Sequence, residues 1–387
     1  MASLLTRLSP VLACAALGLM AAGAQADDHA TIIETEKAKL KVTTVTDGLR
    51  NPWGIAFLPG GDMLVTERSG DLRIVGADGT KGPALKGLPE IASRGQGGLL
   101  DVAIDPDFVD NRWVYFSFSE PGQGGTSTAV ARGKLMPNAQ DELQGVEVIF
   151  SQQPKVRSNG HFGSRLVFRD DGTLFITMGD RQQDFEDNYP QELNSHIGTV
   201  ARIHPDGSVP DDNPFVGDKD AQPEIWSYGH RNVQGADLHP DTRELWTGEH
   251  GPQGGDEINV TRAGNNYGWP IITYGEQYGG GKIGEGTEKE GMEQPVHYWD
   301  PSIANAGMVF YTGNQFPEWR GNLLVTALKF QLVSRLELDG EKVTHEERMF
   351  DESIGKRLRD IEQGPDGNLY LLTDDRNGEI LKVEPAK

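Results

Sequence analysis

One stretch of the chain, residues 227–268, concentrates side chains that bind and polarise ligands on turn-forming sequence. It contains Gly229-His230-Arg231-Asn232 and Glu249-His250-Gly251-Pro252, and then Asp256-Glu257 and Asn266-Tyr267-Gly268. A guanidinium, an amide, several carboxylates and the carbonyls of a Gly-Pro turn are more polar chemistry than turns require. We interpret this stretch as part of a binding or catalytic site.

His161 is the candidate general base, and it lies in Ser158-Asn159-Gly160-His161-Phe162-Gly163, just before a predicted strand. Its flanking glycines let the backbone approach a ligand closely, and imidazole exchanges protons near neutral pH. The alternative is a histidine that only satisfies its own turn. This motif by itself does not decide between the two interpretations.

Four cations stand at predicted junctions of loops and strands: Arg231, Lys329, Arg357 and Arg359. Alternate residues of an extended chain share a face, so Arg357 and Arg359 should point together and Leu358 away. Such a cluster suits a small ligand with several carboxylates, because the guanidinium fork matches carboxylate geometry. The alternative is that the cations neutralise nearby acids, for which Asp360 and Glu362 are close enough in sequence.

The Gly251-Pro252 turn offers carbonyl oxygen, the hard donor that Ca²⁺ prefers. Downstream, Glu257 and the carbonyl of Tyr267 could supply a second oxygen site. The alternative is an ordinary Gly-Pro turn followed by a solvated acidic patch. No spacing of histidines and cysteines supports a zinc site.

Residues 1–26 have the layout of a cleaved secretory signal, with Arg7, an apolar run over 11–22 and Ala24-Gln25-Ala26. The run is short for a membrane-spanning helix, so we expect no stable membrane insertion. Export predicts a periplasmic or secreted mature chain. The single cysteine, Cys14, falls inside this segment, so the mature protein has no disulfide and no cysteine metal site.

The chain is strongly acidic, with 36 Lys and Arg against 58 Asp and Glu and a net charge of -22. Loss of the signal removes one positive charge, so 35 against 58 leaves -23. A surface of this sign repels nucleic acid and anionic lipid. We therefore expect no nucleic-acid partner.

A turn residue followed by a short alternating apolar run recurs six times, beginning at Gly61, Asn111, Asp171, Thr242, Gly321 and Asp366. Apolar partner segments precede four of these runs, beginning at Trp53, Leu100, Arg165 and Arg359. Runs paired across Asp-Gly or Gly-Asp turns predict antiparallel hairpins.

The repeat predicts an all-β fold: one six-bladed β-propeller of four-stranded antiparallel blades over residues 27–387. The 49 Gly, the 22 Pro and the scarcity of long helical patterns agree with it. A plain β-sandwich is the alternative, although sandwiches seldom sustain six similar hairpins. Long insertions are expected over 178–240 and 249–314, where loops on a rigid scaffold commonly build the site.

Together the motifs resemble those of the soluble PQQ-dependent aldose sugar dehydrogenases of the glucose/sorbosone dehydrogenase family. The resemblance covers the mature chain and rests on Gly95-Gln96-Gly97-Gly98-Leu99-Leu100, Gly160-His161-Phe162-Gly163-Ser164-Arg165-Leu166, Gly229-His230-Arg231-Asn232-Val233-Gln234-Gly235, Glu249-His250-Gly251-Pro252, Asp256-Glu257-Ile258-Asn259, Asn266-Tyr267-Gly268-Trp269-Pro270, Leu328-Lys329 and Arg357-Leu358-Arg359-Asp360. It implies a six-bladed propeller that binds pyrroloquinoline quinone (PQQ) and calcium.

The resemblance also implies roles for these residues. His161 takes the proton from the C1 hydroxyl of a cyclic sugar while the C1 hydride passes to the quinone, and the product is a lactone. Arg231 polarises the quinone oxygen, with Asn232 beside it. The cofactor's carboxylates and carbonyls are held by Gln96, Lys329, Arg357 and Arg359, with Tyr278 contacting it from the inserted loop.

For calcium, the resemblance implies that the carbonyls of Gly251 and Pro252 hold the ion against the quinone and that Asp256 supports them. In family members with an additional calcium, the equivalents of Glu257 and Tyr267 bind it. One departure is His250, where the glucose dehydrogenase branch has glutamine. The chain also lacks much of that branch's inserted loop material, which favours the broad-specificity aldose enzymes.

Two other classes of function remain open from the sequence. A calcium-dependent six-bladed lactonase would hold a central calcium with acidic and amide side chains and would not need four cations at the mouth. A non-catalytic propeller of the hedgehog-interacting type shares the fold without needing the base. For the dehydrogenase, the expected partners are an aldose and a small-molecule or protein electron acceptor, and the expected assembly is a monomer or weak dimer.

Overall fold

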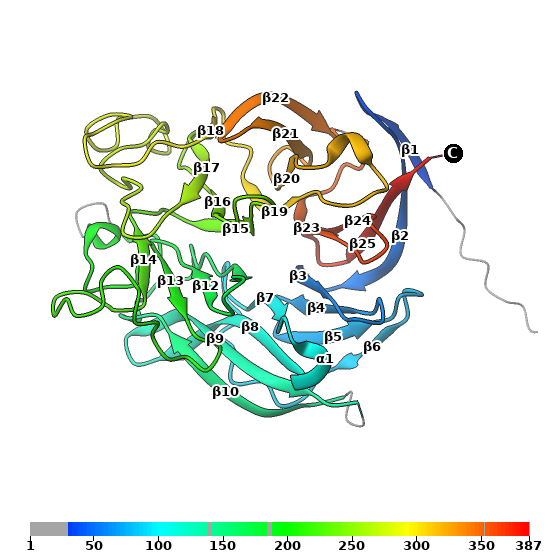
Figure 1. Ribbon diagram of the computed structural model, residues 1–387, viewed down its shortest axis with the longest axis horizontal. Coiled ribbons are helices and arrows are strands. Elements are labelled where there is room, and N and C mark those ends of the chain that lie inside the picture. Colours follow the sequence, from blue (N-terminus) through cyan, green and yellow to red (C-terminus); the bar gives the residue numbers. More distant parts are fainter. Residues whose placement is uncertain (1–29, 138–140, 184–187, 352, 387) are drawn as a thin grey trace, which may run out of the picture.

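The computed structural model describes residues 30–137, 141–183, 188–351 and 353–386. The predicted signal segment, residues 1–26, lies outside the described residues. Figure 1 shows six sheets arranged around a common axis, each radiating outward from an inner strand. The predicted six-bladed β-propeller is therefore confirmed.

The blades are numbered here in chain order from the sheet that begins at Pro52. Blade one contains β3 (Pro52–Phe57), β4 (Met63–Glu67), β5 (Asp71–Val75) and β6 (Lys81–Ala84). Blade two contains β7 (Leu99–Ile104), β8 (Trp113–Gly122), β9 (Gly125–Leu135) and β10 (Leu143–Ser151). Blade three contains β11 (Leu166–Phe168), β12 (Leu174–Thr177), β13 (Thr199–Ile203) and β14 (Ile225–Tyr228).

Blade four contains β15 (Val233–Leu238), β16 (Leu245–Glu249), β17 (Asp256–Thr261) and β18 (His297–Trp299). Blade five contains β19 (Asn305–Phe310), β20 (Leu323–Ala327), β21 (Val333–Asp339) and β22 (Lys342–Met349). The short helices among the described residues are α1 (Phe108–Asn111), η2 (Tyr189–Gln191) and η3 (Pro317–Trp319). No helix in the described ranges is long and apolar enough to cross a bilayer.

Blade six joins the two ends of the chain and closes the ring. It contains β23 (Leu358–Gln363), β24 (Leu369–Thr373) and β25 (Gly378–Pro385), and β25 pairs with β2 (Lys39–Leu49) from the start of the described chain. β1 (Thr31–Glu34) adds a fifth strand at the outer edge, beside β2 in Figure 1. Pairing of distant segments in one sheet removes an open edge between the first and last blades.

All six predicted hairpins are present, and each joins the inner strand of a blade to its second strand. The apolar residues of neighbouring blades then pack against each other. One cluster combines Leu64 of blade one with Phe116 of blade two, and another combines Trp246 of blade four with Val325 of blade five. Each blade thus buries the apolar face of the next.

Buried carboxylates of alternate blades accept backbone hydrogen bonds from the next blade. Asp101 of blade two accepts the N–H of Leu166 at 2.7 Å, and Asp237 of blade four accepts that of Phe310 at 2.8 Å. Asp360 of blade six accepts the N–H of Ile55 at 3.3 Å. Burial raises the pKa of Asp237 to about 6, although the backbone N–H donors oppose that shift.

The strand order divides the connections between two faces. Within each blade, the connection from the first to the second strand and the connection from the third to the fourth strand begin on one face of the propeller. We call this face the turn face. Connections from a second to a third strand, or from a fourth strand to the next blade, lie on the opposite face, the mouth face, because the strands are antiparallel. The expected insertions lie in the connections 178–198, 204–224 and 262–296.

Candidate active site

The sequence-predicted residues come from connections and strand ends on the mouth face. Six of these residues lie just before the first strand of a blade or at its start: Gln96, His161, Arg231, Asn232, Arg357 and Arg359. Lys329 and Gly251-Pro252 lie between second and third strands, and Glu257 is on β17. Tyr267 and Tyr278 lie on the connection 262–296, which runs back to this face, where Tyr267 donates its N–H to the carbonyl of Tyr228 at 2.8 Å.

His161 is held by a carboxylate that sequence reasoning missed. Its Nδ1 lies 2.6 Å from Oδ1 of Asp180, whose Oδ2 accepts the indole N–H of Trp269 at 2.9 Å. In neutral His161 the proton therefore resides on Nδ1, so Nε2 carries the lone pair of a general base. Asp180 follows a predicted strand on the same face as His161, and that position was the available signal.

The surroundings of His161 favour the neutral ring. The residue is only 7 % exposed, and burial lowers the pKa of His161 while Asp180 offsets part of that effect. Its backbone has a positive φ of 47°, and its N–H donates to Oε1 of Gln96 at 2.8 Å. Gln96 thus positions the backbone of the candidate base, a role not predicted for it.

Arg231 and Asn232 line the same mouth and are both buried. Arg231 Nη1 donates to the carbonyl of Gly251 at 2.6 Å and to that of His250 at 2.9 Å. Asn232 Oδ1 accepts the N–H of Gly163 at 3.1 Å. In the described structure, Nε of Arg231 and Nδ2 of Asn232 are buried without a hydrogen-bond partner.

Arg357 and Arg359 point together, as expected, and their common partner is Asp374. Nη2 of Arg357 and Nη2 of Arg359 lie 3.2 and 3.0 Å from Asp374 Oδ2. Burial opposes the charge on Asp374, but the arginines more than offset it and hold the pKa of this carboxyl well below its usual range. Asp360, one of the acids considered from sequence, instead binds Arg165 at 3.0 Å.

Arg359 reaches further into the mouth than Arg357. Its Nη1 donates to Oε1 of Gln234 at 2.7 Å, and its Nε is buried without a partner in the described structure. Arg357 is half-exposed and donates to the carbonyl of Leu328 at 3.3 Å. The pair therefore presents one buried and one accessible guanidinium.

Lys329 and Tyr278 are both exposed. The ammonium of Lys329 lies 5.1 Å from the centroid of the Phe330 ring. Tyr278 is 76 % exposed on the connection 262–296. Gln253 and Glu276 exchange backbone hydrogen bonds of 3.0 and 2.9 Å, which bring the segment before Tyr278 beside the Gly251-Pro252 turn.

Asp256 shapes that turn. Its Oδ1 accepts the N–H of Gly251 at 2.8 Å, and its Oδ2 accepts that of Ala304 at 2.6 Å. A Cβ on Gly251 would lie 2.2 Å from the carbonyl oxygen of Gly254, so the turn requires glycine. His250 contacts the carbonyl of Asn305, and burial lowers the pKa of His250 to about 3, so its ring is neutral.

Glu257 and Tyr267 lie together beneath the turn. With Gly251 and Glu249 they line a cavity of about 10 Å³. Burial, with Glu249 nearby, raises the pKa of Glu257 to about 8. The hydroxyl of Tyr267 donates to the carbonyl of Val260 at 2.6 Å.

The fold and the site together define a class: a six-bladed propeller enzyme with a carboxylate-oriented histidine among guanidinium donors at one mouth. The chain belongs to the glucose/sorbosone dehydrogenase family, whose family model matches residues 49–382. It is 44 % identical over 352 residues to the aldose sugar dehydrogenase YliI of Escherichia coli, covering 90 % of this chain and 94 % of that protein.

Solved structures agree with this placement. A glucose dehydrogenase crystal structure matches with a TM-score of 0.86 and 46 % identity, covering 89 % of this chain and 99 % of that one. The PQQ-bound form of aldose sugar dehydrogenase from Streptomyces coelicolor matches with a TM-score of 0.72 and 29 % identity, covering 90 % and 99 %. The prediction of a dehydrogenase oxidoreductase is thus confirmed over the lactonase and the non-catalytic propeller.

Proposed function

We propose that this protein oxidises aldose sugars at C1 to the lactone, using PQQ and Ca²⁺, and passes the electrons to an external acceptor. The observation that carries the proposal is the His161–Asp180 pair at 2.6 Å, set in a mouth with Arg231 and Arg359. The relative named aldose sugar dehydrogenase and the PQQ-bound neighbour support this choice of substrate and cofactor.

The residues at the mouth fit an anionic quinone. Among the sequence-predicted residues at the mouth, three buried donor nitrogens lack a partner in the described structure: Arg231 Nε, Asn232 Nδ2 and Arg359 Nε. An unpaired buried donor costs roughly 1–3 kcal/mol, so a ligand bearing carboxylates and carbonyls would relieve that cost. We assign its binding to Arg231, Asn232, Arg359, Arg357, Lys329, Gln96 and Tyr278.

PQQ, when bound, supplies a two-electron acceptor for the hydride of the sugar C1. His161 Nε2 receives the proton of the C1 hydroxyl, and Asp180 stabilises the resulting imidazolium across the 2.6 Å contact. Arg231 contributes positive charge from a buried, preorganised position where negative charge develops. Buried donors of this kind need little reorganisation during the reaction.

The Gly251-Pro252 turn fits calcium only as part of a larger ligand set. Two carbonyls supply two of the six to eight oxygen ligands that Ca²⁺ takes. Among the described residues, no group of three or more His, Cys, Asp or Glu could hold a metal. The carbonyl of Gly251 also accepts Arg231 Nη1, so the ion and the guanidinium would share that oxygen. We propose that cofactor and water complete the site.

We propose that a second calcium binds between Glu257 and the carbonyl of Tyr267, because both residues line a cavity of about 10 Å³, which is large enough for one small ion or water. We further propose export by cleavage of residues 1–26 to the periplasm or medium, and a monomer or weak dimer. Binding of nucleic acid is disfavoured by the net charge of -22.

The test is reconstitution of the full mature chain. The purified protein is mixed with PQQ and Ca²⁺, and lactone formation is followed with several aldoses and a dye acceptor. Sugar-dependent dye reduction is the expected result. Tight PQQ binding without turnover on any aldose would overturn the proposed reaction.

A further inference from the structure

A second pocket on the mouth face is lined by cations. It has a volume of about 320 Å³, and its lining includes Arg50, Arg68, Arg94 and Arg376 together with Asn51 and Ser93. No aspartate or glutamate lines it. Four guanidiniums at one pocket are unexpected in a protein of net charge -22.

Most of these guanidiniums are available to a ligand. Arg50 pairs with Glu67 at 3.3 Å and also contacts Asp71. Arg68, Arg94 and Arg376, in contrast, form no ion pair with any described residue, although the charge of Arg68 helps to lower the pKa of Asp374. Arg94 and Arg376 are exposed, so they present positive charge directly to the solvent.

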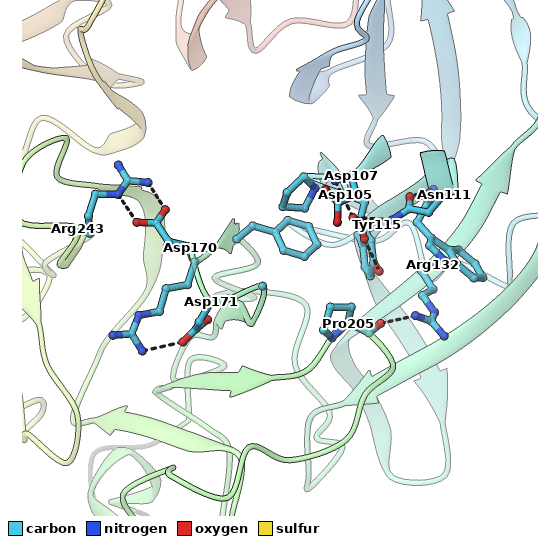
Figure 2. Close-up of a pocket in the computed structure, with 14 residues that line it drawn as sticks. Asp105, Asp107, Asn111, Tyr115, Arg132, Asp170, Asp171, Pro205 and Arg243 are labelled. Atoms are coloured by element: carbon cyan, nitrogen blue, oxygen red, sulfur yellow. Dashed lines mark hydrogen bonds and ion pairs between the residues drawn. The ribbon is translucent and has the colours of Figure 1, made fainter. Parts of the chain in front are cut away.

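The pocket on the turn face provides a comparison within the same molecule. It is larger, about 850 Å³, and also contains arginines, but these are neutralised. Arg243 binds Asp170 through two contacts of 2.7 Å, and Arg169 binds Asp171 at 3.1 Å. Figure 2 shows Arg243 against Asp170 there, and Arg132 against the carbonyl of Pro205. The cationic pocket therefore differs from the larger pocket on the turn face in its arginines, most of which form no ion pair.

The cationic pocket adjoins both halves of the candidate active site. Arg68 donates its N–H to the carbonyl of Asn51 at 3.1 Å, and Asn51 Nδ2 donates to Asp374 Oδ1 at 3.3 Å. Asp374 in turn binds Arg357 and Arg359. On the other side, Gly95 and Gly97 of the lining flank Gln96, which holds the backbone of His161.

We infer that this pocket binds the anionic group of a small-molecule electron acceptor, an inference that rests on the proposed function. Aldose and lactone are neutral, so neither requires unpaired guanidiniums. Oxidation of one aldose releases two electrons and two protons, and two one-electron anions such as hexacyanoferrate(III) are reduced for each lactone formed. A local cation cluster attracts such an anion against the repulsion of the acidic surface.

The kinetic test compares acceptors of opposite charge. The double variant Arg94→Gln/Arg376→Gln, the mouth variant, changes two exposed side chains outside the proposed catalytic machinery. The matched control is Lys219→Gln/Arg320→Gln, which removes the same charge from exposed positions on the turn face. Reconstituted enzyme is assayed with hexacyanoferrate(III) and with the cationic N-methylphenazinium ion.

We expect kcat/KM for hexacyanoferrate(III) to fall about tenfold in the mouth variant, with a weaker dependence on salt. The cationic acceptor should react at least as fast as before, and the control should change both rates little. Equal losses for both acceptors, or the same loss in the control, would overturn the inference. A loss specific to a sugar uronate over its neutral aldose, with hexacyanoferrate(III) unaffected, would assign the pocket to substrate and also overturn it.

A binding measurement separates this inference from the proposed reaction. The full cofactor-free chain is titrated calorimetrically with hexacyanoferrate(II), the reduced anion, which cannot act as the electron acceptor. About tenfold weaker binding in the mouth variant than in the control supports the pocket, and equal binding contradicts it. Absence of turnover with both acceptors would instead refute the proposed reaction and leave the titration interpretable.

Discussion

Nδ1 of His161 lies 2.6 Å from Oδ1 of Asp180, and this contact joins the connection between blades two and three to the connection between the second and third strands of blade three. Trp269 of blade four completes the arrangement by donating to the other oxygen of Asp180. The pair therefore leaves Nε2 of His161 as the nitrogen that would accept a proton in the proposed reaction. It also places a buried negative charge where an imidazolium would form.

Removal of the base should abolish most of the turnover. We expect His161→Ala to lower kcat by a factor of about 10²–10⁴, the usual contribution of a positioned general base. PQQ binding, followed by absorbance titration, should remain close to the wild-type value. Wild-type kcat in this variant would contradict the assignment of the base.

Asp180→Asn tests the positioning carboxylate through pH dependence. Burial lowers the pKa of His161 while Asp180 raises it, and Arg231 and Arg181 lower it further, so the wild-type acid limb of kcat/KM should lie below pH 6.5. Without the carboxylate the pKa falls again, and the limb should move to lower pH. The plateau should drop by roughly tenfold or more because the tautomer is no longer fixed. An unchanged pH profile would limit Asp180 to a structural role.

The two arginines should differ in their effect on the cofactor. Each charge-assisted hydrogen bond contributes about 1.5–3 kcal/mol, so Arg359→Gln should weaken PQQ binding by about 10- to 100-fold. Arg357→Gln should have a smaller effect because that side chain is half-exposed. Equilibrium titration measures both, with thermal unfolding as the control for folding. Equal, wild-type affinities would remove these residues from the cofactor site.

Calcium should be required, and Asp256 should set its affinity. Chelation should remove activity that added Ca²⁺ restores, because the turn carbonyls alone cannot complete the ligand set. Asp256→Asn weakens the hold on the Gly251 N–H, now 2.8 Å from Asp256 Oδ1, and should raise the half-saturating Ca²⁺ concentration about tenfold. Full activity after exhaustive chelation would exclude the calcium assignment.

Thr177→Val tests how the blades are fastened together. The buried hydroxyl of Thr177 accepts the N–H of Arg165 at 2.9 Å and donates to the carbonyl of Val233, in the next blade, at 2.9 Å. The substitution keeps the shape but leaves two backbone groups unpaired, so the free energy of unfolding should fall by about 2 kcal/mol in urea titrations. The exposed Thr287→Val should change it by less than about 0.5 kcal/mol. Equal stability of both variants would contradict this role.

Much of the fold was predictable because its signals are local. The six hairpins follow from turn residues and alternating apolar runs only a few residues apart, and their number defined the propeller. Closure by β2 and β25 was not predictable, because those strands pair residues as distant as Val42 and Val383. The fifth strand of blade six, β1, was also missed, although it pairs with β2 only a few residues along the chain.

The sequence by itself determined the chemical types at the site, since His161, Arg231 and the Arg357/Arg359 pair stand on recognisable motifs beside strands. Only the tertiary structure decided their partners: Asp180 for His161, Asp374 for both arginines, and Gln96 for the backbone of the base. It also gathered Arg68, Arg94 and Arg376 at one pocket. The physical reason is that antiparallel blades return distant connections to one face, so proximity there depends on ring closure and not on spacing along the chain.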